Sequence, residues 1–168
     1  MFVISLCQTN PLTIMRTIDA WLNEYGESHQ NPTNKLVHWI CVPAIFFSVV
    51  GLLYSIKLPV LIAENLPLNV AMLVLALVTI YYIRLSVTLA IGLILFTSLC
   101  LFLAQQVENQ GWSLWQVSLG IFVIAWIGQF WGHKVEGKKP SFFKDLQFLM
   151  IGPAWLMHFI YKKAGIPY

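Results

Sequence analysis

A polar segment leads into the first long apolar run of the chain, and it reads Glu27-Ser28-His29-Gln30-Asn31-Pro32-Thr33-Asn34-Lys35-Leu36-Val37-His38. Pro32 suits the first position of a helix, and the side chain of Asn31 can cap that helix. His29 then lies on the polar approach, and His38 lies within the first two turns. The segment therefore predicts a capped helix start that carries two of the four histidines to the edge of the apolar run.

The composition is that of an integral membrane protein. Of 168 residues, 58% are hydrophobic and only 10% are charged, whereas soluble domains carry about 25% charged residues. We expect a single membrane domain over residues 1–168. The modest positive charge needs no nucleic-acid partner, because basic residues flank membrane spans. Cys7, Cys41 and Cys100 are widely spaced and form no CxxC pair, which predicts free thiols.

Four apolar segments have lengths near the roughly 20 residues that a bilayer span requires. They cover residues 36–56, 66–83, 86–104 and 114–131. Arg84, Leu85 and Ser86 leave only a tight turn between the second and third, so these two should form an antiparallel hairpin. The predicted fold is all-α, an integral membrane four-helix bundle.

Two further segments flank the spans. Residues 11–25 repeat apolar side chains at helical spacing after a start signal at Asn10 and Pro11, and they predict an amphipathic helix on the membrane surface or over a site. The apolar tail from Phe142 to Tyr161 is interrupted by Gly152 and Pro153. We expect it to form a re-entrant or interfacial helical segment.

The basic residues define an orientation. With four spans, nine of the ten basic residues share one side, and Lys57 alone lies on the other. The positive-inside rule then places both termini in the cytoplasm. The compact chain favours a bacterial inner membrane, with the endoplasmic reticulum membrane as the alternative.

Histidines should meet on the cytoplasmic side. His38 opens the first span and His133 follows the fourth, an even number of crossings apart, and His29 lies on the same side. Glu136 would share one helix face with His133. Helical bundles build metal sites from such residues, and this set suits Fe(II) oxygen chemistry or zinc. Hydrogen-bonding histidines in a lipid-binding or scaffold protein, and a zinc-dependent lipid hydrolase, remain alternatives.

Other polar residues are candidates for supporting roles. Asn31, Asn34 and Gln129 are candidates to orient the metal ligands or to bind substrate, although capping alone explains Asn31. Lys138 and Lys139 suit a cytoplasmic loop, or the binding of an anionic lipid headgroup or a fatty-acid carboxylate. His158, among apolar residues, is either packed in the tail or an additional ligand. Gly128 and Gly132 form a small-xxx-small pattern that favours close helix packing.

The two histidine segments resemble a known family. The segment from His29 to His38, followed by Cys41-Val42-Pro43, is similar to the first signature of the 2-hydroxy fatty acid dioxygenases. The segment from Gln129 to Pro140 (QFWGHKVEGKKP) is similar to the second. The resemblance covers nearly the whole chain.

This resemblance implies an Fe(II)-dependent dioxygenase of α-oxidation. Such an enzyme uses O2 to cleave a 2-hydroxy long-chain fatty acid into CO2 and a fatty acid one carbon shorter. The implied iron ligands are His29, His38 and His133, and Glu136 is implied as a ligand, a base or a residue that orients a ligand. The expected partners are the 2-hydroxy fatty acid, O2 and membrane lipid; homo-oligomerisation is left open.

Overall fold

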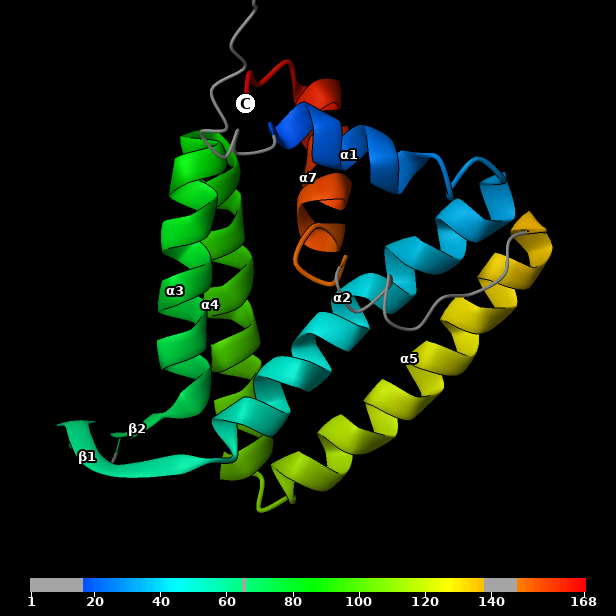
Figure 1. Ribbon diagram of the computed structural model, residues 1–168. Helices are drawn as coiled ribbons and strands as arrows, with labels where there is room; N and C mark the ends of the chain where they lie inside the picture. The colour runs from blue at the N-terminus through cyan, green and yellow to red at the C-terminus, as the bar shows by residue number, and fades with distance from the viewer. Residues whose placement is uncertain (1–16, 65, 138–147) are drawn as a thin grey trace, which may run out of the picture.

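A computed structural model describes residues 17–64, 66–137 and 148–168 of the chain. These residues form helices and one two-stranded antiparallel hairpin (Figure 1). In chain order the elements are α1 (Ile18–Gly26), α2 (Pro32–Tyr54), β1 (Lys57–Ala63), β2 (Leu66–Asn69), α3 (Val70–Leu85), α4 (Val87–Asn109), α5 (Leu114–Glu136) and α7 (Gly152–Ala164).

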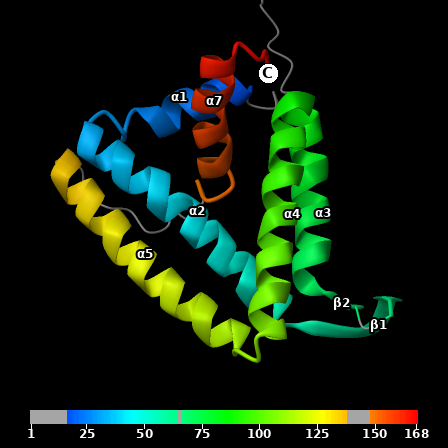
Figure 2. The same cartoon turned by 180° about the vertical axis from the view of Figure 1, so that it is seen from behind.

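The long helices form two antiparallel pairs rather than an even bundle. Helices α2 and α5 run side by side in both views, as do α3 and α4 (Figures 1 and 2). The two pairs meet at the end that carries the hairpin and diverge toward the other end. Helix α7 lies in the opening between α2 and α4, and α1 crosses α7. The predicted all-helical class is confirmed for most of the described residues. The helices do not form the predicted regular four-helix bundle, because the two pairs diverge and α7 lies between them.

Side-chain caps set the starts of the helices. Asn31 is the N-cap of α2 and accepts a hydrogen bond from the N–H of Thr33, with Pro32 in the first turn, as the sequence predicts. Ser86 ends α3 and also caps α4 by accepting from the N–H of Leu89. The predicted tight turn between these two helices is therefore confirmed.

Three of the four expected spans are helices long and apolar enough to cross a membrane, namely α2, α4 and α5. The expected span 66–83 is wrong at its start, because residues 66–69 pair with β1 and Asn69 caps a helix that begins at Val70. Helix α3 has 16 residues, which gives about 24 Å against the roughly 30 Å of a bilayer core.

The outer faces of these helices match a lipid environment. Leu77, Leu95 and Ile124 are 67%, 69% and 72% exposed, and they come from α3, α4 and α5. Exposed apolar surface on this scale marks a membrane or protein interface. With the three long apolar helices, it supports membrane association.

The amphipathic first helix begins later than the sequence suggests. Thr17 has extended backbone and caps α1 through Ala20, so the helix starts at Ile18. The start signal at Asn10 and Pro11 lies outside the described residues. The apolar face is as expected, since Ile18, Leu22 and Tyr25 are all buried.

Helix α7 uses the Gly152-Pro153 pair as its beginning. The expected interruption of the tail is thus a helix start, with proline in the first turn. The 13 residues of α7 give about 20 Å, too short for a span. Figures 1 and 2 show its C-terminal end on the side where α1 lies. The re-entrant path through a bilayer stays a prediction.

Glycines allow α5 to approach α2 closely. A Cβ atom on Gly128 would lie 2.7 Å from Sγ of Cys41, and one on Gly132 would lie 2.5 Å from Oδ1 of Asn34. The small-xxx-small pattern is thereby confirmed as a packing motif. Cys41 and Cys100 are free and buried, as expected; Cys7 lies outside the described residues.

Candidate metal centre

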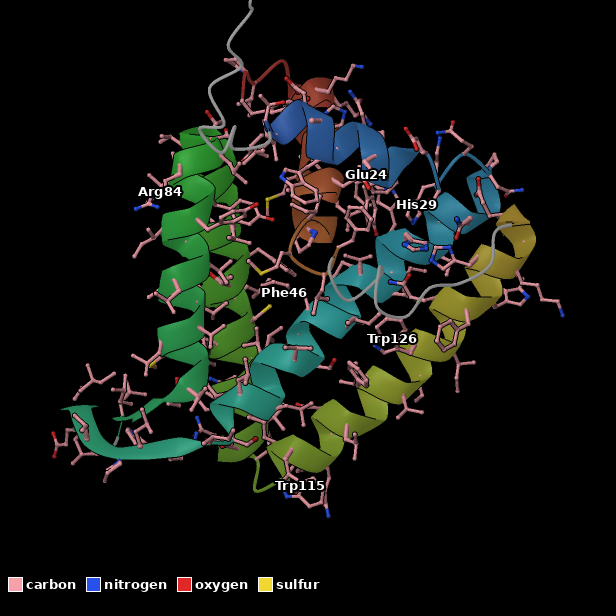
Figure 3. All side chains as sticks on the ribbon, in the orientation of Figure 1. Glu24, His29, Phe46, Arg84, Trp115 and Trp126 are labelled. Carbon is pink, nitrogen blue, oxygen red and sulfur yellow. The ribbon has the colours of Figure 1, made fainter. Side chains whose placement is uncertain are left out.

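Three histidines from three different segments meet where α1 leads into α2. His29 lies in the loop between these helices, His38 in the second turn of α2, and His133 in the last turn of α5. Figure 3 shows His29 at this corner. The ring centroids of His29 and His38 are 4.1 Å apart, and His133 lies 5.6 and 5.1 Å from them. All three side chains are at most 3% exposed.

The three rings fit a metal ion by position and by chemistry. Their ligand atoms lie within 4.8 Å of one another. An ion about 2.1 Å from each nitrogen holds two nitrogens at most about 4.2 Å apart, so binding needs an adjustment below one ångström. Imidazole nitrogens suit iron, zinc and copper. Three such ligands leave coordination positions for substrate.

Tyr25 holds two of the histidines. Its backbone carbonyl accepts a hydrogen bond of 2.6 Å from Nδ1 of His29. Because a carbonyl can only accept, Nδ1 carries the proton, and Nε2 is the ring atom with a lone pair. The Tyr25 ring also stacks on His29, with centroids 4.2 Å apart, and its hydroxyl lies 3.3 Å from Nδ1 of His38. Such contacts commonly orient metal-binding histidines.

His38 gives a specific sign of an absent partner. Its Nε2 atom is fully buried and has no hydrogen-bond partner within the described parts of the chain. Buried polar atoms nearly always have a partner. A metal ion at the centre of the three rings would supply one.

Glu136 lies beside the histidines but turns to the backbone of the loop. Its Oε1 accepts from the N–H of Gln30 at 2.8 Å, and its Oε2 accepts from the N–H of Asn31 at 2.9 Å. The Asn34 amide adds a third hydrogen bond at 3.0 Å. The carboxylate thereby fixes the loop that carries His29. It is not part of the group of ligand atoms around the histidines.

Asn34 connects the loop to both helices. Its side chain is fully buried, and its Nδ2 donates to the carbonyl of Ser28 as well as to Glu136. Gly132, directly before His133, leaves the space that the Asn34 side chain occupies. Asn34 therefore lies against the loop that carries His29, and Asn31 acts as the helix cap.

A crevice lies about one helical turn from His38 and His133, and its walls include Tyr25, which contacts His29 and His38. It has a volume of about 20 Å³ and includes Tyr25, Val42, Gln129 and Gly152 in its walls. Val42 follows His38 by one helical turn, and Gln129 precedes His133 by one turn. Gln129, which is 6% exposed, provides a polar side chain in an otherwise largely apolar crevice.

The remaining candidates lie elsewhere. Nδ1 of His158 bonds to the hydroxyl of Tyr168, and His158 is outside the three-histidine group. Lys138 and Lys139 lie outside the described residues. Tyr25 was missed as a site residue, because the pattern gave it only a place on the apolar face of α1. Its position four residues before His29 was the available signal.

Comparisons with known proteins identify the family of the chain. The family model described as "2-hydroxy-palmitic acid dioxygenase Mpo1-like" matches residues 15–164. The chain is 33% identical over 149 residues to "2-hydroxy-palmitic acid dioxygenase MPO1" of Saccharomyces cerevisiae, which covers 87% of this chain and 81% of the yeast protein. No solved structure matches the chain significantly.

Proposed function

The chain belongs to the Mpo1-like family of 2-hydroxy-palmitic acid dioxygenases, and from this premise we infer that it is a dioxygenase of 2-hydroxy fatty acids. The proposed reaction breaks the C1–C2 bond of the substrate. C1 leaves as CO2, and C2 becomes the carboxyl carbon of an acid one carbon shorter. One O2 molecule accepts the four electrons that the substrate loses, and one water molecule is released as the third product.

We propose that His29, His38 and His133 hold an Fe(II) ion through their Nε2 atoms. The buried cluster of three imidazoles is the observation that carries this proposal. When bound, the iron supplies electrons and open coordination positions for chemistry with O2. These three histidines lack the carboxylate of the 2-His-1-carboxylate triad that many non-haem Fe(II) oxygenases use. Zinc is therefore also compatible with the ligand type.

The surrounding residues orient the site and control water. Tyr25 fixes the tautomer of His29 through its carbonyl, and Glu136 holds the loop on which His29 lies. We assign Glu136 a positioning role in place of ligand or base, because its carboxylate already accepts three hydrogen bonds. Gln129 is the candidate to bind the substrate carboxylate or 2-hydroxyl, and the narrow crevice around it limits the access of water.

The membrane setting suits such a substrate. A fatty acid keeps its carboxylate near the headgroups and its chain in the hydrocarbon, and His38 and His133 lie near the ends of apolar helices. We propose that both termini face the cytoplasm, on the strength of the basic-residue distribution. The relative comes from yeast, which gives no support to a bacterial membrane over the endoplasmic reticulum. Lys138 and Lys139 stay candidates for carboxylate binding.

Metal analysis and turnover test the proposal together. Protein purified without oxygen should bind about one Fe(II) per chain and convert 2-hydroxypalmitate to pentadecanoate and CO2. His38→Ala and His133→Ala should lose both iron and activity. His158→Ala is the matched control and should keep both. Stoichiometric zinc with lipid hydrolysis, or no metal in the wild type after Fe(II) is supplied, would overturn the iron assignment.

A further inference from the structure

An apolar groove lies beside the metal centre, between α2, α4 and α7. It has a volume of about 180 Å³, and its lining side chains are all apolar. Trp39 and Val42 come from α2, Phe96 from α4, and Leu156 and Ile160 from α7. Such a surface has no group that recognises a polar headgroup. It fits a hydrocarbon chain.

The groove shares one wall with the crevice that lies one helical turn from His38 and His133. Val42 lines both, and the adjacent residues Gly152 and Pro153 line the crevice and the groove, respectively. A Cβ atom on Gly152 would lie 2.9 Å from Cγ1 of Val42. Because residue 152 has no side chain, Val42 packs directly against the backbone there and forms part of the wall between the two spaces.

The other end of the groove opens to the surroundings. Trp39 and Ile160 are 39% and 51% exposed. The same two residues border a wider depression of about 510 Å³ on the outer surface. A chain lying in the groove can therefore reach it from the lipid and continue beyond it.

We propose that the groove is the acyl-chain subsite of the enzyme, with the substrate chain leaving the crevice past Val42 and lying between α2, α4 and α7. This inference rests on the proposed function, since the carboxylate and 2-hydroxyl must reach the three histidines. The wall that the groove shares with the crevice at Val42 and Gly152, and the contacts of Tyr25 in that crevice with His29 and His38, favour the substrate chain over a bilayer lipid as the occupant. Phe96 and Ile160 then help to set chain-length preference.

Photocrosslinking tests the position of the chain without turnover. The probe is 2-hydroxypalmitate with a diazirine near its terminal carbon, added to the full-length protein with Fe(II) and without oxygen. Crosslinks should map to peptides of α4 around Phe96 and of α7 around Ile160, and excess 2-hydroxypalmitate should prevent them. Crosslinks confined to α5, or groove crosslinks that the substrate does not prevent, overturn the inference; the latter indicates a structural lipid.

Substrate selectivity provides the second test. Ile160→Trp narrows the groove and should lower kcat/KM for 2-hydroxypalmitate about tenfold, with little change for 2-hydroxyoctanoate. Phe96→Ala widens it and should shift the preference toward longer chains. Ile127→Trp is the control, because Ile127 is 63% exposed on α5 and lines none of the described cavities.

The outcomes separate this inference from the proposed function. If the wild type shortens 2-hydroxypalmitate while Ile160→Trp and Phe96→Ala keep its chain-length profile, the subsite is wrong and the function stands. If the wild type shortens no 2-hydroxy acid, the function fails. The crosslinking result, which needs no turnover, then still decides whether the groove holds the chain.

Discussion

The carboxylate of Glu136 caps the N-terminus of α2 from another helix, since it accepts a hydrogen bond of 2.9 Å from the backbone N–H of Asn31. In a capping box, the third residue of the helix itself supplies such a carboxylate or amide. Asn34 holds that position in α2 and is too short for this role, so α5 supplies the acceptor. The positive end of the α2 dipole also favours a carboxylate here. The contact fixes His29 and His133 relative to each other.

Removing the Glu136 carboxylate should loosen the metal centre. Glu136→Ala leaves the N–H groups of Gln30 and Asn31 without their acceptor, which should cost about 1–3 kcal/mol of unfolding free energy. Glu136→Gln keeps one acceptor oxygen, so its free energy of unfolding should lie between those of the wild type and Glu136→Ala. The iron content, measured after equilibration at limiting Fe(II), should be highest in the wild type, lower in Glu136→Gln and lowest in Glu136→Ala. Glu108→Gln is the control, because Glu108 pairs with Lys57 far from the histidines. Equal iron binding in all variants would show that Glu136 does not position His29.

The Tyr25 hydroxyl should matter for iron affinity more than for folding. Tyr25→Phe keeps the ring that stacks on His29 and the carbonyl that accepts from Nδ1, but it removes the hydroxyl next to His38. Loss of such a contact typically weakens metal affinity about 10- to 100-fold. Competition with a chelator of known affinity measures it.

Tyr161→Phe is the matched control for Tyr25→Phe. It also removes one tyrosine hydroxyl, which donates to the carbonyl of Thr88 at 3.0 Å away from the site. Iron affinity should be unchanged in this variant. A similar loss in both variants would mean that general destabilisation, rather than orientation of His38, is responsible.

Much of the site could be predicted because its signals are local. Asn31 and Pro32 predict the break before α2, and the structure has α2 begin there. The even number of crossings predicts that His38 and His133 share one end, and the three histidines do meet. Helix α5 continues through His133 to Glu136 and ends at Gly137, which has a φ of 74° that glycine adopts readily.

The missed features depend on tertiary contacts that have no sequence pattern. Two of the three hydrogen-bond donors to Glu136 are backbone N–H groups about a hundred residues away, and any sequence supplies these. Residues 66–69 join directly onto the apolar run of α3, yet they pair with β1. Helix α7 fills the space between two helix pairs because the pairs diverge, which no periodicity within either pair indicates.

Gly132 should be required for the approach of α5 to α2. In Gly132→Ala the new methyl group would lie 2.5 Å from Oδ1 of Asn34, and overpacking of this kind costs about 1–3 kcal/mol. Displacement of Asn34 should also release Glu136, so iron binding should weaken. Gly120→Ala is the control on the same helix, because its added Cβ meets no atom within 4 Å. It should leave iron binding unchanged, and thermal unfolding with iron titration compares the two. Unchanged stability and iron binding in Gly132→Ala would contradict the close contact.

His158 should make the stability of the protein depend on pH. Burial, and then the charge of Lys162, lower the pKa of His158, while Asp19 partly opposes them. The unfolded chain therefore binds this proton more readily, so the contribution of His158 is complete above about pH 6.5 and is lost as the pH falls. The free energy of unfolding should decrease less between pH 7.5 and pH 5.5 in His158→Gln than in the wild type, because the other histidines are common to both. Tyr168→Phe removes the hydrogen bond to His158 and should keep the wild-type pH dependence if burial is the cause. The same slope in His158→Gln and the wild type would assign the pH dependence to other groups.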